Sequence, residues 1–282
     1  MKFYRFYLKA NRKLLLCMLG IMLSIDLLIF AADLENMGVD GYWKPLLISL
    51  GFTVLTMLIL IGLIVFKVRK DRDFLKLYDR LGPCQETIEL YRRKHPKMRV
   101  IDHLVICTYY KAMGDLDEAE RIISFVSSCV MPDIRTRAYY SEILLGLRIH
   151  QRRFQEAAVI FNNYNSMMSV YCRSNPGAIA VEHYSHAALM YAMSGNINAA
   201  LDAISLMDKS IRRERQLAFS RNTALMGVYL IGGDYRKADE LKALMLRDVK
   251  DFDGFLFESN RGIVLKDIES IETLFDPRAK AH

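Results

Sequence analysis

The sequence predicts an all-α protein, with an N-terminal transmembrane helical hairpin followed by an α-solenoid of stacked helical hairpins. Two long apolar runs, 14–32 and 46–66, predict the membrane part. About 20 apolar residues are needed for a helix to cross a hydrocarbon core of ~30 Å, and each run is close to that length. Through residues 67–282, apolar side chains recur every three or four positions, which is typical of amphipathic helices, and one corner pattern appears four times.

Basic residues flank the two apolar runs on one side only. Residues 1–13 contain five Lys or Arg and no acid, and residues 67–72 contain four more, whereas the link 33–45 holds three acids and one lysine. By the positive-inside rule, both termini are cytoplasmic and the link is outside. We expect a multi-pass protein of the cell membrane with two transmembrane helices. The compact size and the absence of a transit or retention signal favour a bacterial plasma membrane.

A cleaved signal peptide is the alternative for the first run. Phe30 lies where a small residue is needed for cleavage after Ala32, and a second full-length apolar run begins soon afterwards, at Leu46. We therefore interpret both runs as permanent membrane helices.

Asp26 is the one charged residue inside either run. An Asp near a helix centre costs about 3 kcal/mol on insertion, while each Leu, Ile, Phe or Val returns about 0.3–0.6. The run contains eleven such residues, so insertion still wins. An antiparallel second helix would place Thr53 near the same depth. Two interpretations stay open: Asp26 is protonated or hydrogen-bonded to Thr53, or it contacts a basic residue of another membrane protein.

The charge of the cytoplasmic part is modest. The whole chain carries a formal charge of +7, of which residues 67–282 contribute +5. Basic residues between 67 and 80 alternate with acids, which indicates contact with the inner leaflet and not a nucleic-acid patch. The five cysteines show no C-x-x-C spacing, so we expect them to be buried small residues without disulfides.

A corner pattern recurs at Gly114, Arg152, Gly195 and Gly233, which lie 38, 43 and 38 positions apart. The corner residue is expected to end one helix in the left-handed conformation, which costs glycine nothing. An apolar residue follows two positions later. An alanine five positions after the corner then lets the second helix approach the first. A tyrosine four positions before the corner packs between hairpins, except in the second copy, which has Arg148.

This pattern resembles the tetratricopeptide repeat. The matching residues are Tyr110 and Ala119 in the first copy, and Tyr191 and Ala200 in the third. The resemblance covers residues 97–250 and implies a TPR-like α-solenoid, because one such hairpin cannot bury its own apolar face. The corners lie farther apart than the family's usual spacing of about 34 residues, so longer helices or loops must absorb the difference.

The predicted organisation has five parts. They are a basic cytoplasmic tail (1–13), the transmembrane hairpin (14–66), a juxtamembrane helical linker (67–96), the TPR-like repeats (97–250), and a C-terminal capping helix with its tail (251–282). In the linker, residues 67–81 continue the second membrane helix, and residues 85–94 form the next one.

Residues 262–275 are expected to form the closing helix. Its buried face would contain Ile263, Ile268, Ile271 and Leu274. Its water-facing side would contain Lys266, Asp267, Glu269 and Glu272.

The resemblance also implies a concave groove lined by the first helix of each hairpin. The residues projected onto that face are Thr108, Lys111, Tyr139, Glu142, Glu182, His186 and Thr223. Family members that grip a C-terminal carboxylate use several Lys, Arg and Asn in this groove. Only Lys111 is basic here, so we do not expect that mode.

Catalytic motifs are not evident. His183 and His186 share one helix face and could bind zinc, but no third ligand is evident, so packed histidines are the favoured interpretation. A metal-dependent enzyme built on this pair remains a rival. No phosphate-binding loop and no Gly-x-Ser-x-Gly elbow occur. We expect no enzyme activity, cofactor, metal, nucleic acid or small-molecule substrate.

We therefore expect a membrane-anchored helical-repeat scaffold or adaptor, integral to the lipid bilayer, that binds a protein partner through the concave repeat surface on the cytoplasmic face. The alternative is an accessory subunit of a membrane transport, secretion or envelope-assembly complex. That subunit would contact its partner through the transmembrane hairpin, at Asp26 and Thr53.

Overall fold

The structure is a computed structural model that describes residues 16–25, 27–28, 43–212 and 214–280. It divides into two compact units, Met1–Lys76 and Leu77–His282. Every regular element among the described residues is helical, which confirms the predicted all-α class.

The helices of the first unit expose many apolar side chains. Helix α2 spans Trp43–Leu81, and its stretch Leu50–Leu81 is the one helix in the described part of the chain that is long and apolar enough to cross a membrane. The apolar helix Leu16–Ile25 is shorter than that. Most of the large apolar side chains of α2 between residues 47 and 66 are exposed, by 42–67 %. The second predicted run therefore gives one candidate membrane helix, and the two-span hairpin is not shown.

The two predicted intramembrane contact residues differ in what the structure describes. Thr53 is 5 % exposed, although large apolar residues around it on α2 are exposed. Asp26 and the basic tail 1–13 lie outside the described residues.

Helix α2 ends inside the second unit, at the predicted stop. Gly82 follows with φ +68° and donates its N–H to the Tyr78 carbonyl at 2.8 Å. Helix α3 then spans Gln85–Lys94, with the bounds predicted from the sequence.

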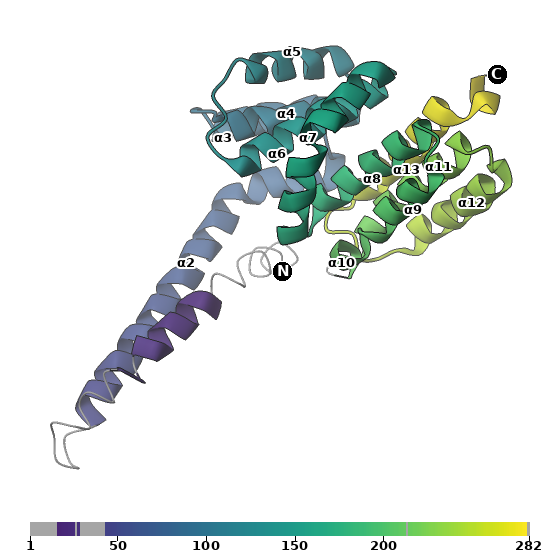
Figure 1. Cartoon of the computed structure of the whole chain (residues 1–282). Helices are drawn as coiled ribbons and strands as arrows, with labels where there is room; N and C mark the ends of the chain where they lie inside the picture. Colours follow the sequence, from purple (N-terminus) through teal and green to yellow (C-terminus); the bar gives the residue numbers. More distant parts are fainter. Residues whose placement is uncertain (1–15, 26, 29–42, 213, 281–282) are drawn as a thin grey trace. The chain divides into compact units, whose positions relative to one another are not determined.

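Four helical hairpins follow one another along the chain (Figure 1). Their helices are α4 (Val100–Met113) with α5 (Leu116–Ser127), α6 (Ile134–His150) with α7 (Phe154–Ser174), α8 (Ala178–Met193) with α9 (Ile197–Ser205), and α11 (Leu217–Ile231) with α12 (Tyr235–Asp251). The four predicted corners are therefore all present. The extra spacing between corners is taken up partly by α7, which has 21 residues, and by the short helix α10 (Asp208–Ile211).

The corners have the predicted left-handed backbone. Gly114, Gly195 and Gly233 have φ of +87°, +81° and +78°, and Arg152 has φ +59°. Arg152 is the one non-glycine residue with positive φ among those described. At every corner the next N–H donates to the carbonyl five positions earlier, at 2.9–3.0 Å. This hydrogen bond satisfies a carbonyl that a helix C-terminus would otherwise leave free.

The second helix of each hairpin approaches closely at the predicted alanine. These residues, Ala119, Ala157, Ala200 and Ala238, are 0–1 % exposed. In three hairpins a polar side chain also caps this helix: Asp115, Asn196 and Asp234 accept backbone N–H groups at 3.1–3.3 Å.

The apolar core is divided along the stack. One cluster joins α3 to α6, a second joins α6 to α9 and α11, and a third joins α8, α11, α12 and α13. Neighbouring hairpins therefore bury each other's apolar faces, as in repeat arrays generally. Of the five cysteines, all free, Cys107 and Cys172 are buried, but Cys17 is exposed and two are half-buried, so the expectation of burial was wrong for those three.

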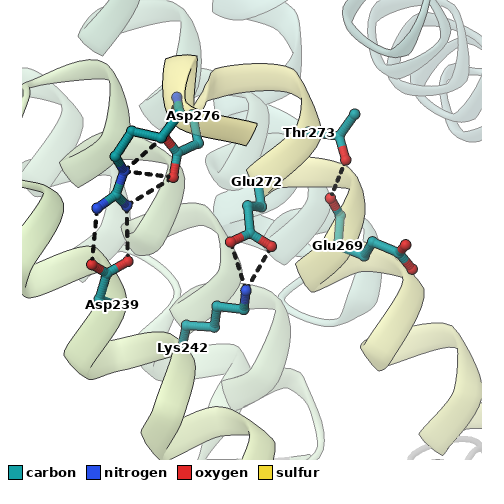
Figure 2. Close-up of polar contacts among 7 residues, drawn as sticks. Asp239, Lys242, Glu269, Glu272, Thr273 and Asp276 are labelled. Atoms are coloured by element: carbon teal, nitrogen blue, oxygen red, sulfur yellow. Dashed lines mark hydrogen bonds and ion pairs between the residues drawn. The ribbon is translucent and has the colours of Figure 1, made fainter. Parts of the chain in front are cut away.

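The predicted closing helix is α13 (Ser259–Phe275), followed by the short helix η2 (Pro277–Lys280). Three predicted core residues, Ile268, Ile271 and Leu274, are buried, whereas Ile263 is half-buried. Of the four residues predicted to face water, Lys266, Asp267 and Glu269 are exposed, whereas Glu272 is half-buried and forms an ion pair with Lys242 of α12 at 2.6 Å (Figure 2).

Candidate functional site

A buried carboxylate joins two of the hairpins. Glu142 of α6 is 2 % exposed, and each of its oxygens faces a histidine of α8. Nδ1 of His183 lies 2.7 Å from Oε1, and Nδ1 of His186 lies 2.9 Å from Oε2. An ionised carboxylate only accepts hydrogen bonds, so both Nδ1 atoms donate.

Burial alone would raise the pKa of Glu142. The hydrogen bonds from His183 and His186 outweigh it and lower the pKa to about 2, so the carboxylate stays ionised near neutral pH. Breaking one partner of such a buried group is costly, because the remaining charge loses its compensation. Nε2 of His183 is buried without a hydrogen-bond partner.

An ion pair lies beside this carboxylate. Nζ of Lys111 on α4 is 3.0 Å from Oε1 of Glu182 on α8. The Lys111 side chain is 12 % exposed and that of Glu182 is 38 % exposed, so solvent reaches the acid more easily. Burial opposes both charges, but their mutual attraction raises the pKa of Lys111 and lowers that of Glu182.

Gly146 of α6 lets these groups come together. A Cβ at this position would lie 2.9 Å from Cε1 of His186 and 3.0 Å from Nζ of Lys111. Any larger residue would have to push the imidazole or the ammonium away. The missing side chain therefore allows α4, α6 and α8 to share one polar cluster.

Two further titratable residues belong to the same electrostatic surroundings. Nδ1 of His150 lies 3.1 Å from the Gly146 carbonyl, and burial, Lys111 and His186 together lower the His150 pKa to about 3. Asp267 of α13 is exposed, yet the surrounding protein desolvates its carboxylate. This desolvation and the charge of Glu182 raise its pKa to about 6, against the opposing effect of Lys111.

We call six of these residues the inner-face cluster: Lys111, Glu142, His150, Glu182, His183 and His186. They come from the first helices of the first three hairpins. Four of the seven residues projected from the sequence lie in this cluster: Lys111, Glu142, Glu182 and His186.

The other three projected residues lie outside the cluster. The hydroxyls of Thr108 and Thr223 donate to carbonyls of their own helices, at 3.0 and 2.9 Å. Tyr139 is half-buried, and the guanidinium of Arg135 lies 5.7 Å from its ring centroid.

Sequence reasoning missed the place of His150 and Asp267 in this site. Gly146 was the available signal, since a glycine inside a helix often marks a close approach of other groups. His183 was expected to be a packed histidine, with zinc binding as the rival, but its contact with the same carboxylate as His186 was not predicted.

The inner-face cluster provides charged groups, but its described residues do not form a set of metal ligands. Among the described residues, no group of three or more His, Cys, Asp or Glu is placed to hold a metal ion. The Nδ1 atoms of His183 and His186 both face Glu142. Chemically, the cluster fixes α6 against α8 and leaves Lys111 and Glu182 partly accessible. Comparison with protein-family models, curated proteins and solved structures gives no match.

Proposed function

We propose that this chain is a membrane-anchored helical-repeat adaptor that binds a protein partner on the cytoplasmic face. Its hairpins form a TPR-like α-solenoid, and two transmembrane helices hold it in a bacterial plasma membrane with both termini inside. The proposal requires no catalysis by the chain.

The exposed apolar surface of α2 supports the membrane part of the proposal. Most of its large side chains between residues 47 and 66 are 42–67 % exposed. Such a surface is stable in lipid but is a liability in water. The basic residues at positions 67–72 favour a cytoplasmic location for the chain that follows them.

The inner-face cluster carries the proposal of partner binding. Three first helices, α4, α6 and α8, direct polar groups to one place, and stacked repeats use such surfaces for binding. The Lys111–Glu182 pair joins residues 71 positions apart, so the surface exists only when the hairpins are stacked. A charged protein segment could replace one member of this pair and form an ion pair with either Lys111 or Glu182.

Photocrosslinking in cells tests the adaptor function. A photoreactive amino acid at Thr108, on the first helix of its hairpin, is expected to capture a protein partner in the membrane fraction. The same probe at Gln155, which is exposed on the second helix α7, serves as the matched control. No adduct at 108, or equal adducts at both positions, contradicts the proposal.

A second experiment separates the adaptor from the accessory subunit that assembles through its membrane helices. In the adaptor, Asp26→Asn leaves the Thr108 crosslink and membrane association intact. Loss of assembly with an unchanged circular dichroism spectrum favours the subunit instead. Carbonate extraction that releases the protein from membranes, or digestion of a C-terminal tag from outside intact cells, contradicts the anchor or its orientation.

A further inference from the structure

The first helices of the four hairpins run parallel to one another. A Cβ on Gly146 of α6 would lie 3.0 Å from Nζ of Lys111 on α4, and a Cβ on Gly227 of α11 would lie 2.6 Å from Cδ2 of Leu189 on α8. All four residues lie close to the C-terminal ends of their helices. Helices α6 and α8 meet in the same order through the inner-face cluster. The corners therefore share one edge of the stack, and the connections between hairpins share the opposite edge (Figure 1).

These two edges, which we call the corner edge and the loop edge, differ in charge. Nine acids and five Lys or Arg lie on the corner edge, which consists of residues 114–122, 152–160, 195–203 and 233–241. Nine Lys or Arg and three acids lie on the loop edge, which consists of residues 95–99, 125–137, 170–177 and 206–216. The positive charge of the stack is therefore gathered on the loop edge.

The cations of the loop edge face solvent. All eight whose side chains the structure describes are exposed, namely Lys97, Arg99, Arg135, Arg137, Arg173, Lys209, Arg212 and Arg215. The three acids of this edge are engaged within the fold. Asp133 accepts a backbone N–H at the start of α6, Asp208 forms an ion pair with an arginine of α11, and Glu214 accepts a hydrogen bond from a nearby glutamine. The loop edge therefore attracts a negatively charged surface.

Large apolar side chains are exposed between these cations. Val130, in the connection between α5 and α6, is 89 % exposed. Four more exposed residues lie at or beside the helix ends of the same edge: Phe125, Ile134, Val170 and Leu206. Exposed apolar side chains beside basic residues are the combination by which proteins enter the boundary between lipid headgroups and acyl chains. Charge and apolar exposure together thus indicate a lipid surface.

The charge pattern also limits this surface along the chain. The connection after the fourth hairpin, residues 251–258, contains Asp251, Asp253 and Glu258 and no Lys or Arg. An anionic surface repels this segment. The contact is therefore confined to the connections that precede the fourth hairpin.

We propose that the loop edge rests on the anionic inner leaflet of the membrane, with Val130 and its apolar neighbours inserted among the headgroups. The ligand is lipid with a net negative charge, which cytoplasmic leaflets carry. This inference rests on the membrane anchor proposed above. Because the anchor keeps the stack close to the bilayer, weak attractions at the separate cations act together. The stack is then held at two places, which fixes how the inner-face cluster is presented to the cytosol.

Tryptophan fluorescence of the full chain in nanodiscs tests the contact. Trp43 is the one tryptophan of the sequence, so Trp43→Phe gives a background without tryptophan emission. Val130→Trp then reports on the loop edge, and Val159→Trp, at a valine of the corner edge that is 60 % exposed, is the matched control. In discs with brominated acyl chains and about 30 % phosphatidylglycerol, we expect at least about twofold quenching of Val130→Trp and none of Val159→Trp. In discs of phosphatidylcholine alone, the quenching of Val130→Trp is lost.

Charge reversals separate the attraction of the cations from the preference of tryptophan for lipid. Arg135→Glu/Arg137→Glu places acids in the first turn of α6, where the helix dipole favours them, so we expect the fold to be retained. In anionic discs this variant loses the quenching of Val130→Trp. Arg236→Glu/Lys237→Glu reverses two exposed cations of the corner edge and leaves the quenching unchanged. Circular dichroism verifies that both variants are folded.

Equal quenching at positions 130 and 159 overturns the proposal, and so does quenching at position 130 that is the same in neutral and anionic discs. An emission shift that appears only with two chains per disc assigns the loop edge to a second copy of the chain and overturns it too. The anchor fails separately. A chain that does not enter the discs refutes the anchor and this proposal with it, whereas a chain that enters them without quenching at position 130 refutes the loop-edge contact alone.

Discussion

Hairpins α8–α9 and α6–α7 reach the same corner geometry with different side chains. The first uses Gly195 at the corner and Asn196 as a helix cap. The second uses Arg152 with φ +59° and then Arg153, which makes no side-chain cap. Both corners nevertheless form the same backbone hydrogen bond at 2.9 Å. The stacking of neighbouring hairpins therefore imposes the corner even where the local sequence opposes it.

The two hairpins also differ in the residue four positions before the corner. Tyr191 packs edge-on against Phe161, with ring centroids 5.3 Å apart. Arg148, in the same place of the weaker copy, is 9 % exposed and contacts Glu120 and Gln151, each at 2.9 Å. In hairpin α8–α9 this position holds an aromatic side chain, and in hairpin α6–α7 it holds an arginine in a network of ion pairs and hydrogen bonds. Removing one partner from the network leaves the other charge uncompensated, which is costly.

The largest effect expected from this comparison is at Arg148. Arg148→Met keeps the bulk but leaves Glu120 without its guanidinium, so we expect a loss of about 2–4 kcal/mol in the free energy of unfolding. Urea unfolding followed by circular dichroism measures it. The control is Arg121→Met. Its ion pair with Glu118 is 70 % exposed at the arginine, so we expect a much smaller loss in the free energy of unfolding. Equal losses would contradict the distinction.

The two hairpins also differ in their response to acid, because α6 ends at His150 and α8 at Met193. The folded pKa of His150 is lowered to about 3 from 6.5, so below pH 6.5 the unfolded chain binds a proton that the folded chain does not. Stability is therefore lost as the pH falls from 6.5 toward 3.

Between pH 7 and 5 we expect wild type to lose about 2 kcal/mol more than His150→Gln, whose amide can still donate to the Gly146 carbonyl. Urea unfolding at both pH values gives the difference. Parallel pH profiles for the two chains would show that this histidine is not held neutral.

A third test exchanges the corner residues. Gly195→Ala is expected to cost about 1–2 kcal/mol, since φ is +81° and no atom lies within 4 Å of the new Cβ to add a clash. Arg152→Gly relieves strain of similar size but loses the hydrogen bond to the Thr273 carbonyl, so its net effect is within about 1 kcal/mol of zero. Thermal unfolding ranks the stabilities of the two variants. Equal changes in stability, with the same sign, would contradict the idea that both corner residues adopt the same left-handed backbone.

The smallest difference concerns the caps. Asn196→Ala removes the side-chain acceptor for the Ala199 N–H and is expected to cost about 1 kcal/mol. Arg153→Ala removes only an exposed ion pair with Glu156, at about 0.5 kcal/mol or less. Hydrogen exchange in the first turns of α9 and α7 reports each effect locally. A larger loss at Arg153 would point to a capping role that the structure does not show.

The sequence predicted the corners well because their causes are local. A glycine or a strained arginine, an Asp or Asn cap and an alanine five positions later lie within one short segment. The end of α2 at Leu81 and the bounds of α3 were predictable for the same reason, from Gly82 and the residues after it.

The candidate site was less predictable, because its contacts join distant segments. Glu142 lies 41 and 44 positions from its histidines, and Lys111 lies 71 from Glu182. The repeat resemblance projected four of these side chains onto one face. It gave no information on their pairing, and it treated α13 as a cap with a solvated acidic side, whereas Glu272 is paired with Lys242.

The start of the second unit contacts the segment that leads into α13. The backbone N–H of Glu258 donates to Asp79 at 2.8 Å, and the rings of Phe257 and Tyr78 lie 5.0 Å apart. A linear stack normally frays from its two tips, where the outermost units have only one neighbour. Here the first residues of the unit are held by the segment that leads into α13, so fraying from the start of the unit must first break this contact.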